Sequence, residues 1–212
     1  MIPLLLKIKR EQHKNIARAQ DIIIETIYKF FDKAVLHGGT AIWRCYKSNR
    51  FSEDIDMYIN RDLDKIELFF KELEKIGFLI EKKKIGENSI YSSLRFNNCN
   101  VRFEALFKKS ESQLADYETI DGNYITIYSL NPENLIKEKV DTYLKRRKIR
   151  DLYDIFFLLR YVKNKNEINI NLKKLLNKFE TPADENDLKI LIFEGLVPKT
   201  DKMVEYIKYH SN

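Results

Sequence analysis

Two short segments decide the fold of this 212-residue chain: His37-Gly38-Gly39-Thr40-Ala41 and Arg50-Phe51-Ser52-Glu53-Asp54-Ile55-Asp56. The apolar run Ala34-Val35-Leu36 predicts a buried strand that the two glycines end. A helix is expected to open directly after them, from Thr40 to about Tyr46. Backbone N–H groups at a helix start attract anions, and glycine lets a phosphate approach the main chain closely. The first segment therefore predicts a phosphate site.

The second segment predicts a strand over residues 54–60 with two carboxylates on one face. Asp54 and Asp56 alternate with Ile55, so both aspartates project to the same side, about 6.6 Å apart along the strand. Without a cation the two charges would repel each other, and Mg²⁺ prefers such hard oxygen ligands. Thirteen residues separate Thr40 from Asp54, which is enough for one helix and a return loop. We therefore expect the aspartates to lie beside the glycine turn.

Each segment alone also has an ordinary structural explanation. Gly-Gly-Thr is often a turn with a helix-capping threonine, and Asp-x-Asp is often a solvated strand edge. Their order, strand–turn–helix–strand at a workable spacing, favours a combined phosphate and metal site.

The remaining hydrophobic pattern predicts an α+β fold with a mixed β-sheet and flanking helices, followed by an all-helical C-terminal half. Helices are expected over 16–31 and 62–76, and strands over 78–84, 89–96, 100–107 and 124–130. After Pro132 only helices are expected, over 132–146, 150–162, 172–179, 184–193 and 202–209. We place the domain seam near Asn131-Pro132, which gives a catalytic domain of residues 1–130 and a helical domain of residues 131–212.

Composition narrows the class of protein. The net charge of +6 indicates a moderate preference for an anionic partner. Two cysteines cannot form a disulfide framework or a four-cysteine zinc site, and the three histidines are too scattered to suggest a zinc hydrolase. No signal-peptide core and no stretch of roughly 20 apolar residues is present. We therefore expect a cytoplasmic protein that does not engage a membrane.

In combination, these motifs resemble the AbiEii/AbiGii toxin family of nucleotidyltransferases, within the DNA polymerase β-like superfamily. The resemblance continues in Glu138-Lys139-Val140 and in Arg150-Asp151-Leu152-Tyr153-Asp154-Ile155, which are similar to the family's Glu-Lys-Leu and Arg-Asp-x-Tyr-Asp-Ile motifs. It covers roughly Val35 to Leu159. Thr40 stands where the superfamily usually has a serine, so a hydroxyl is kept.

The resemblance implies roles for single residues. The nucleoside triphosphate would be positioned by Gly38, Gly39, Thr40 and Lys139. Asp54 and Asp56 would bind divalent metal, two Mg²⁺ ions with Mn²⁺ as the alternative. Such enzymes usually carry a third carboxylate on a neighbouring strand, and Glu104, on the polar side of the alternating Val101–Ala105 run, is the best candidate for it. A solvated Glu104 paired with Arg102 is the equal alternative.

Two aspartates of the C-terminal half pose a different problem. Asp151 and Asp154 lie on a predicted helix that is apolar almost all round, so burial is expected, and a buried carboxylate needs a cation or hydrogen bonds. Lys139 or Arg150 could supply that partner. The resemblance includes Asp151 and Lys139 among the catalytic residues, and it leaves open which of Asp151 and Asp154 is the functional carboxylate. A Lys139 that only extends its stem along the apolar surface is the structural alternative.

The implied activity is transfer of a nucleoside monophosphate from a nucleoside triphosphate to an acceptor hydroxyl. By resemblance, relatives use RNA such as the tRNA acceptor end, and many are toxins neutralised by a separately encoded antitoxin protein. The run Lys145–Arg150 carries five cations that either contact RNA phosphates or are simply solvated. The alternatives are a nucleotidyltransferase for small molecules of the antibiotic type, and a nucleotide- or RNA-binding protein without turnover, in which the carboxylates would not converge.

Overall fold

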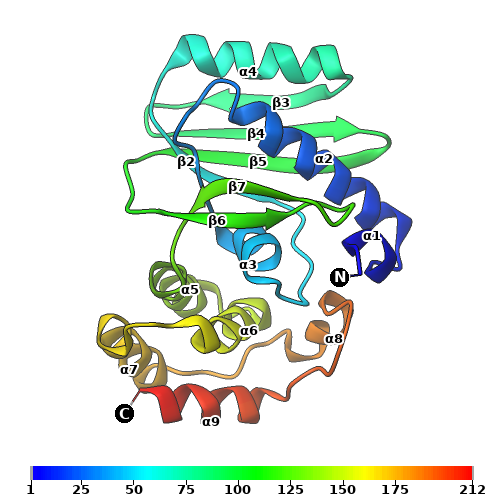
Figure 1. The fold of residues 1–212 in the computed structure, drawn as a ribbon. Coiled ribbons are helices and arrows are strands. Elements are labelled where there is room, and N and C mark those ends of the chain that lie inside the picture. The colour runs from blue at the N-terminus through cyan, green and yellow to red at the C-terminus, as the bar shows by residue number, and fades with distance from the viewer. Residues whose placement is uncertain (1, 212) are drawn as a thin grey trace. The chain divides into compact units, whose positions relative to one another are not determined.

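The computed structural model describes residues 2–211 and forms two compact units (Figure 1). The first unit comprises the chain up to Lys47 together with Ser52–Leu130. The second comprises the short segment Ser48–Phe51 and the chain from Asn131 onward. Within the described range, none of the helices combines the length and the apolar character needed to cross a lipid bilayer.

The first unit is built on a seven-stranded mixed sheet with the strand order β3-β4-β5-β2-β1-β7-β6. Its strands are β1 (Val35–His37), β2 (Ile55–Ile59), β3 (Leu79–Ile85), β4 (Ser89–Phe96), β5 (Cys99–Phe107), β6 (Gln113–Glu118) and β7 (Tyr124–Ser129). β1 runs antiparallel to its neighbour β2, whereas the pairs β2–β5 and β1–β7 are parallel. The mixed sheet is confirmed, as is the prediction that the aspartate strand lies beside the strand that ends in the glycines.

Within residues 2–211, the helices of this unit are α1 (Leu4–Lys7), α2 (Glu11–Ile27), α3 (Gly38–Tyr46) and α4 (Leu63–Ile76). α4 begins where the Asp62 side chain accepts a hydrogen bond from the Lys65 N–H at 3.1 Å, and it ends at Gly77 with φ of 111°. Its Phe69 ring packs against Phe103 of β5 with the centroids 5.1 Å apart. α4 therefore covers the apolar face of the sheet.

The alternation predicted for β2 and β5 is confirmed. Ile55 and Met57 of β2 and Phe103 of β5 are fully buried on the apolar face. Their polar neighbours in sequence project from the opposite face, because successive side chains of a strand alternate. The sheet thus has one apolar face in the core, and the polar side chains of these two strands project from the other face.

The strand β6 was not predicted from the sequence. It lies at the edge of the sheet, and its Leu114 is 63% exposed, while Tyr117 and Glu118 near its end are buried. An edge strand with this burial carries no regular alternation of apolar and polar residues, so the periodicity gave no signal.

The second unit is all helical, as predicted. It contains α5 (Pro132–Arg146), α6 (Ile149–Leu158), α7 (Asn169–Asn177), α8 (Leu188–Leu191) and α9 (Thr200–His210), with 3₁₀ turns at Leu159–Tyr161, Lys165–Glu167 and Glu185–Asp187. α5 starts with Asn131 capping the Asn134 N–H at 2.8 Å and with Pro132 in its first turn. The helix expected over 184–193 is reduced to one 3₁₀ turn and α8, because Ile192 leaves the helix to form a β-bridge with Arg50.

Candidate active site

The glycine turn and one aspartate are in direct contact. β1 ends at His37 and α3 begins at Gly38, whose φ of +69° lies in the left-handed region. A side chain at this position would overlap the carboxylate of Asp56. Glycine is therefore required at residue 38 both by the backbone conformation and by the approach of Asp56.

The sheet register places acidic side chains of adjacent strands in one row. Asp56 of β2 is paired with His37 of β1 on one side and with Glu104 of β5 on the other. Glu104 is in turn paired with Tyr91 of β4. Side chains in register on neighbouring strands share a face, and Asp54, two residues before Asp56, belongs to the same face. The structure thus brings together Gly38, Asp54, Asp56 and Glu104, all within the first unit.

Arg102 lies among these carboxylates. Its guanidinium forms an ion pair with Asp54 and a second with Glu104, the latter with Nε 2.9 Å from Oε1. The predicted Arg102–Glu104 pair therefore exists, and Glu104 also stands in register with Asp56. Burial raises the pKa of Glu104 above its usual range. The positive charge of Arg102 opposes this shift, and the negative charges of Asp56 and Asp54 add to it.

The donor chemistry of this face fits a divalent metal. Three carboxylates supply the hard oxygen ligands that Mg²⁺ prefers. Among residues 2–211, no three acidic, histidine or cysteine side chains are gathered closely enough to hold an ion as they stand. Because Arg102 bridges Asp54 and Glu104, these two carboxylates can share one ion only after the guanidinium has moved aside.

Thr40 has a different environment from the one expected. Helix α3 starts two residues earlier than predicted, so Thr40 falls inside the first turn and is completely buried. Its hydroxyl donates a hydrogen bond to the backbone carbonyl of Asp54. The hydroxyl thus ties the glycine turn to the start of β2. The sequence had suggested a free hydroxyl at this position instead. Gly39 is buried as well.

A buried arginine holds α3 in place. Arg44 is fully buried and donates hydrogen bonds to Asp21 of α2 at 2.6 Å, to the Ala17 carbonyl at 2.9 Å and to the Glu118 carbonyl at 3.1 Å. Tyr117 of β6 donates to the same Asp21 carboxylate at 2.9 Å. These bonds fix the helix that presents the glycine turn.

The second unit contains a buried cluster of charges. Asp154 is fully buried and receives two hydrogen bonds from Arg50, at 2.7 and 2.9 Å, and an ion pair from the Lys139 ammonium at 2.7 Å. Asp151, also fully buried, is paired with Lys139 at 3.3 Å and with Arg146 at 2.7 and 2.8 Å. Burial pushes the pKa of Asp151 upward, but the hydrogen bonds from Arg146 and the charge of Lys139 outweigh it and leave the pKa below its usual range.

This cluster confirms that both aspartates are buried and that Lys139 is a partner of each. The other partners are Arg50 and Arg146 rather than Arg150, because Arg50 arrives with the segment Ser48–Phe51 of this unit. The predicted contact of Lys139 with a triphosphate stays a prediction, as does a catalytic role for Asp151.

The basic run Lys145–Arg150 is largely engaged within the protein. Its central cations form ion pairs with acidic side chains of the same unit, Arg146 with Asp151, Arg147 with Glu180 and Lys148 with Asp184. This run therefore carries less of the case for RNA binding than its sequence suggested.

Sequence reasoning missed the roles of His37 and Arg50 and one contact of Arg102. His37 stacks on Tyr58 with the ring centroids 3.9 Å apart and neighbours Asp56, and its only signal was its place directly before the glycines. Arg102 was expected as a partner of Glu104, but its ion pair with Asp54 was not predicted. Arg50 had no local signal, because its partner is 104 residues away.

A glycine turn at a helix start beside acidic side chains on adjacent strands of a mixed sheet defines a nucleotidyltransferase. The sequence profile described as "Nucleotidyl transferase AbiEii toxin, Type IV TA system" matches residues 25–206, and the chain belongs to this family. It is therefore a nucleotidyltransferase of a toxin–antitoxin family.

Solved structures agree with this fold. The nucleotidyltransferase toxin MenT4 from Mycobacterium tuberculosis H37Rv superposes with a TM-score of 0.66 at 14% identity, over 95% of this chain and 84% of that one. JHP933 from Helicobacter pylori superposes with a TM-score of 0.61 at 19% identity, over 92% of this chain and 90% of that one. At these identities the likeness concerns the fold. No curated protein matches the chain in sequence.

Proposed function

We propose that this protein transfers a nucleoside monophosphate from a nucleoside triphosphate to a hydroxyl of an RNA acceptor, and that the transfer depends on Mg²⁺. The single observation that carries the proposal is the row formed by Asp56 and Glu104 on adjacent parallel strands, with Asp54 on the same face and Gly38 against Asp56. Family membership supports the nucleotidyl transfer itself.

The residues have separate tasks in this proposal. Asp54, Asp56 and Glu104 would hold the metal, for which Mg²⁺ and Mn²⁺ are both suitable. Bound there, the metal supplies positive charge that acidifies an attacking hydroxyl and stabilises the departing pyrophosphate. Gly38, without a side chain, leaves the start of α3 open to the triphosphate, whose charge the helix N-terminus favours.

The reaction needs positioning and charge neutralisation more than covalent chemistry by the protein. The acceptor oxygen forms a bond to the α-phosphorus, and the bond from that phosphorus to the pyrophosphate oxygen breaks. The products are the nucleotidylated acceptor, pyrophosphate and the proton of the hydroxyl. The buried Thr40 hydroxyl and the Arg44 network would keep the turn and Asp54 in register with each other during this exchange.

A toxin family implies a partner as well. We infer that a separately encoded antitoxin protein restrains the enzyme, and that the enzyme acts in the cytoplasm, where nucleoside triphosphates and RNA are both available. These inferences rest on the family and on the net charge of +6, which suits an RNA acceptor better than a cationic antibiotic.

The test of the proposed function uses the full chain with each of the four α-³²P-labelled nucleoside triphosphates, Mg²⁺ and bulk tRNA. We expect label in the RNA with at least one nucleotide and none after EDTA is added. Transfer that persists in EDTA would contradict the metal dependence. Label that appears on no RNA, yet appears on a small-molecule acceptor, would contradict the RNA acceptor.

A further inference from the structure

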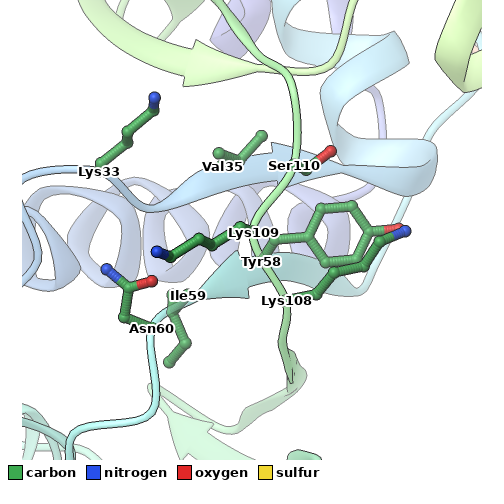
Figure 2. A pocket seen from close by; sticks show the side chains of 8 residues that line it. All are labelled: Lys33, Val35, Tyr58, Ile59, Asn60, Lys108, Lys109 and Ser110. Carbon is green, nitrogen blue, oxygen red and sulfur yellow. The ribbon is translucent and has the colours of Figure 1, made fainter.

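The first unit contains a cavity of about 270 Å³ where β1 begins and β2 ends (Figure 2). Its polar lining comes from Lys33, Asn60, Lys108, Lys109 and Ser110, and the ring of Tyr58 forms one wall. The lysines come from two separate segments, one that precedes β1 and one that follows β5. The fold thus places three lysine residues in the lining of one cavity.

Within the part of the chain that the structure describes, these three lysines have no acidic counterpart. No carboxylate lines the cavity, and across residues 2–211 none of the three lysines forms an ion pair. Other lysines of the same unit behave differently, since Lys29 pairs with Glu72 at 3.2 Å and Lys83 with Glu67 at 2.9 Å. Lysine charges held together without a carboxylate repel each other and raise the local positive potential, which a bound anion relieves.

The cavity adjoins the carboxylate row. Tyr58 lies two residues after Asp56 on the same strand face, about 7 Å along β2. Its ring stacks on His37, which is paired with Asp56, and the Lys108 ammonium lies over the same ring at 4.9 Å from the centroid. Figure 2 shows Lys108 beside the ring of Tyr58. An anion held in the cavity is therefore close to the carboxylate row. It lies toward the C-terminal end of β2, whereas the glycine turn lies near the start of this strand.

We propose that this cavity binds a backbone phosphate of the RNA acceptor close to its reacting hydroxyl, an inference that rests on the proposed function. The volume is below the roughly 300–1,000 Å³ typical of sites for whole small ligands, so a phosphate–sugar fragment fits better than a complete nucleoside triphosphate. Asn60 and Ser110 add neutral hydrogen-bonding groups, which suit a ribose hydroxyl. The lysines supply binding strength that does not depend on RNA sequence.

The test compares two double variants with the same change of charge. K108A/K109A removes two lysines of the cavity, and K71A/K75A removes two exposed lysines from α4, which covers the opposite face of the sheet. Binding of fluorescently labelled bulk tRNA is measured without nucleotide at several salt concentrations, and the KM for the nucleoside triphosphate is measured separately. Thermal melting confirms that both variants are folded.

We expect K108A/K109A to weaken tRNA binding about tenfold or more and to reduce the slope of log K against log[salt] by about 1, because the cavity holds one phosphate and each phosphate contact contributes about 1 to that slope. K71A/K75A should bind tRNA like the wild type, and the KM for nucleotide should be unchanged in both. Equal tRNA binding by the two variants would overturn the proposal, as would a loss confined to nucleotide affinity, which would assign the cavity to the triphosphate. Wild-type protein that binds tRNA through these lysines yet transfers no nucleotide to it would contradict the proposed function and not the cavity.

Discussion

Replacing Asp154 with asparagine should destabilise the protein strongly, because it removes the charge at the centre of a buried cluster. The Asp154 carboxylate is fully buried and is the partner of Arg50, whose side chain is 5% exposed, and of Lys139, whose side chain is 10% exposed. Removing one partner of a buried ion pair costs about 3–5 kcal/mol, since the remaining charge stays desolvated. Two cations lose a partner here, while the asparagine oxygen keeps one acceptor, so we expect a loss of about 3–4 kcal/mol in the free energy of unfolding.

The measurement is urea denaturation followed by circular dichroism. With a slope of about 2–3 kcal/mol per molar urea, the midpoint of Asp154→Asn should fall by about 1–2 M. Asp141→Asn is the matched control, because the Asp141–Lys174 pair is about half exposed on both sides and should contribute at most about 1 kcal/mol. Equal midpoints for the two variants would refute the reasoning that burial gives the cluster its energetic weight.

Three further variants test the site of the first unit. Gly38→Ala should abolish nucleotide transfer by displacing the Asp56 carboxylate. The left-handed conformation of residue 38 should cost the variant only about 1–2 kcal/mol in the free energy of unfolding. Transfer at the wild-type rate by a folded variant would contradict the displacement of Asp56. Arg102→Gln should bind Mn²⁺ more tightly, because the substitution frees Asp54 from its ion pair. Electron paramagnetic resonance titrations measure this affinity, and unchanged or weaker binding would show that the guanidinium does not compete with the metal. Thr40→Val should lower kcat, while Thr40→Ser should retain it, because only serine preserves the hydrogen bond to the Asp54 carbonyl; equal rates in the two variants would remove the positioning role.

Local patterns were sufficient to predict the core of the first unit. The glycine pair, the alternation around Asp54 and the thirteen-residue spacing predicted a strand, a helix and a returning strand, and the register of β1 and β2 confirms that these strands are neighbours. The strand that carries Glu104 followed from its own alternation. These features are local because each depends on residues close together in sequence, at most about fifteen positions apart.

The missed features depend on residues that are distant in sequence. Arg50 reaches Asp154 across 104 residues, and no periodicity in either segment indicates the other. Arg44 reaches Asp21 of another helix in the same way, from a position that looks like an ordinary polar residue of α3. Buried ion pairs of this kind follow from the assembled fold, so a single sequence does not predict them.

The environment of Thr40 shows a second limit. Its residue type and position suggested a hydroxyl available to phosphate. In the structure this hydroxyl donates a hydrogen bond to the backbone carbonyl of Asp54. The difference arises from a helix start displaced by two residues, which turns the side chain from the open end of the turn into the protein. Helix boundaries are the least certain part of sequence reasoning, and here the boundary decided the role of the side chain.

The most direct test of the central claim is nucleotide transfer by the double variant Asp54→Asn/Asp56→Asn. Labelled nucleoside triphosphate, Mg²⁺ and bulk tRNA are incubated with the wild type and with the variant, and thermal melting is recorded for both. The account predicts that transfer falls to background in the variant while the melting transition stays cooperative. Undiminished transfer by the double variant would contradict the assignment of these two carboxylates to metal and catalysis.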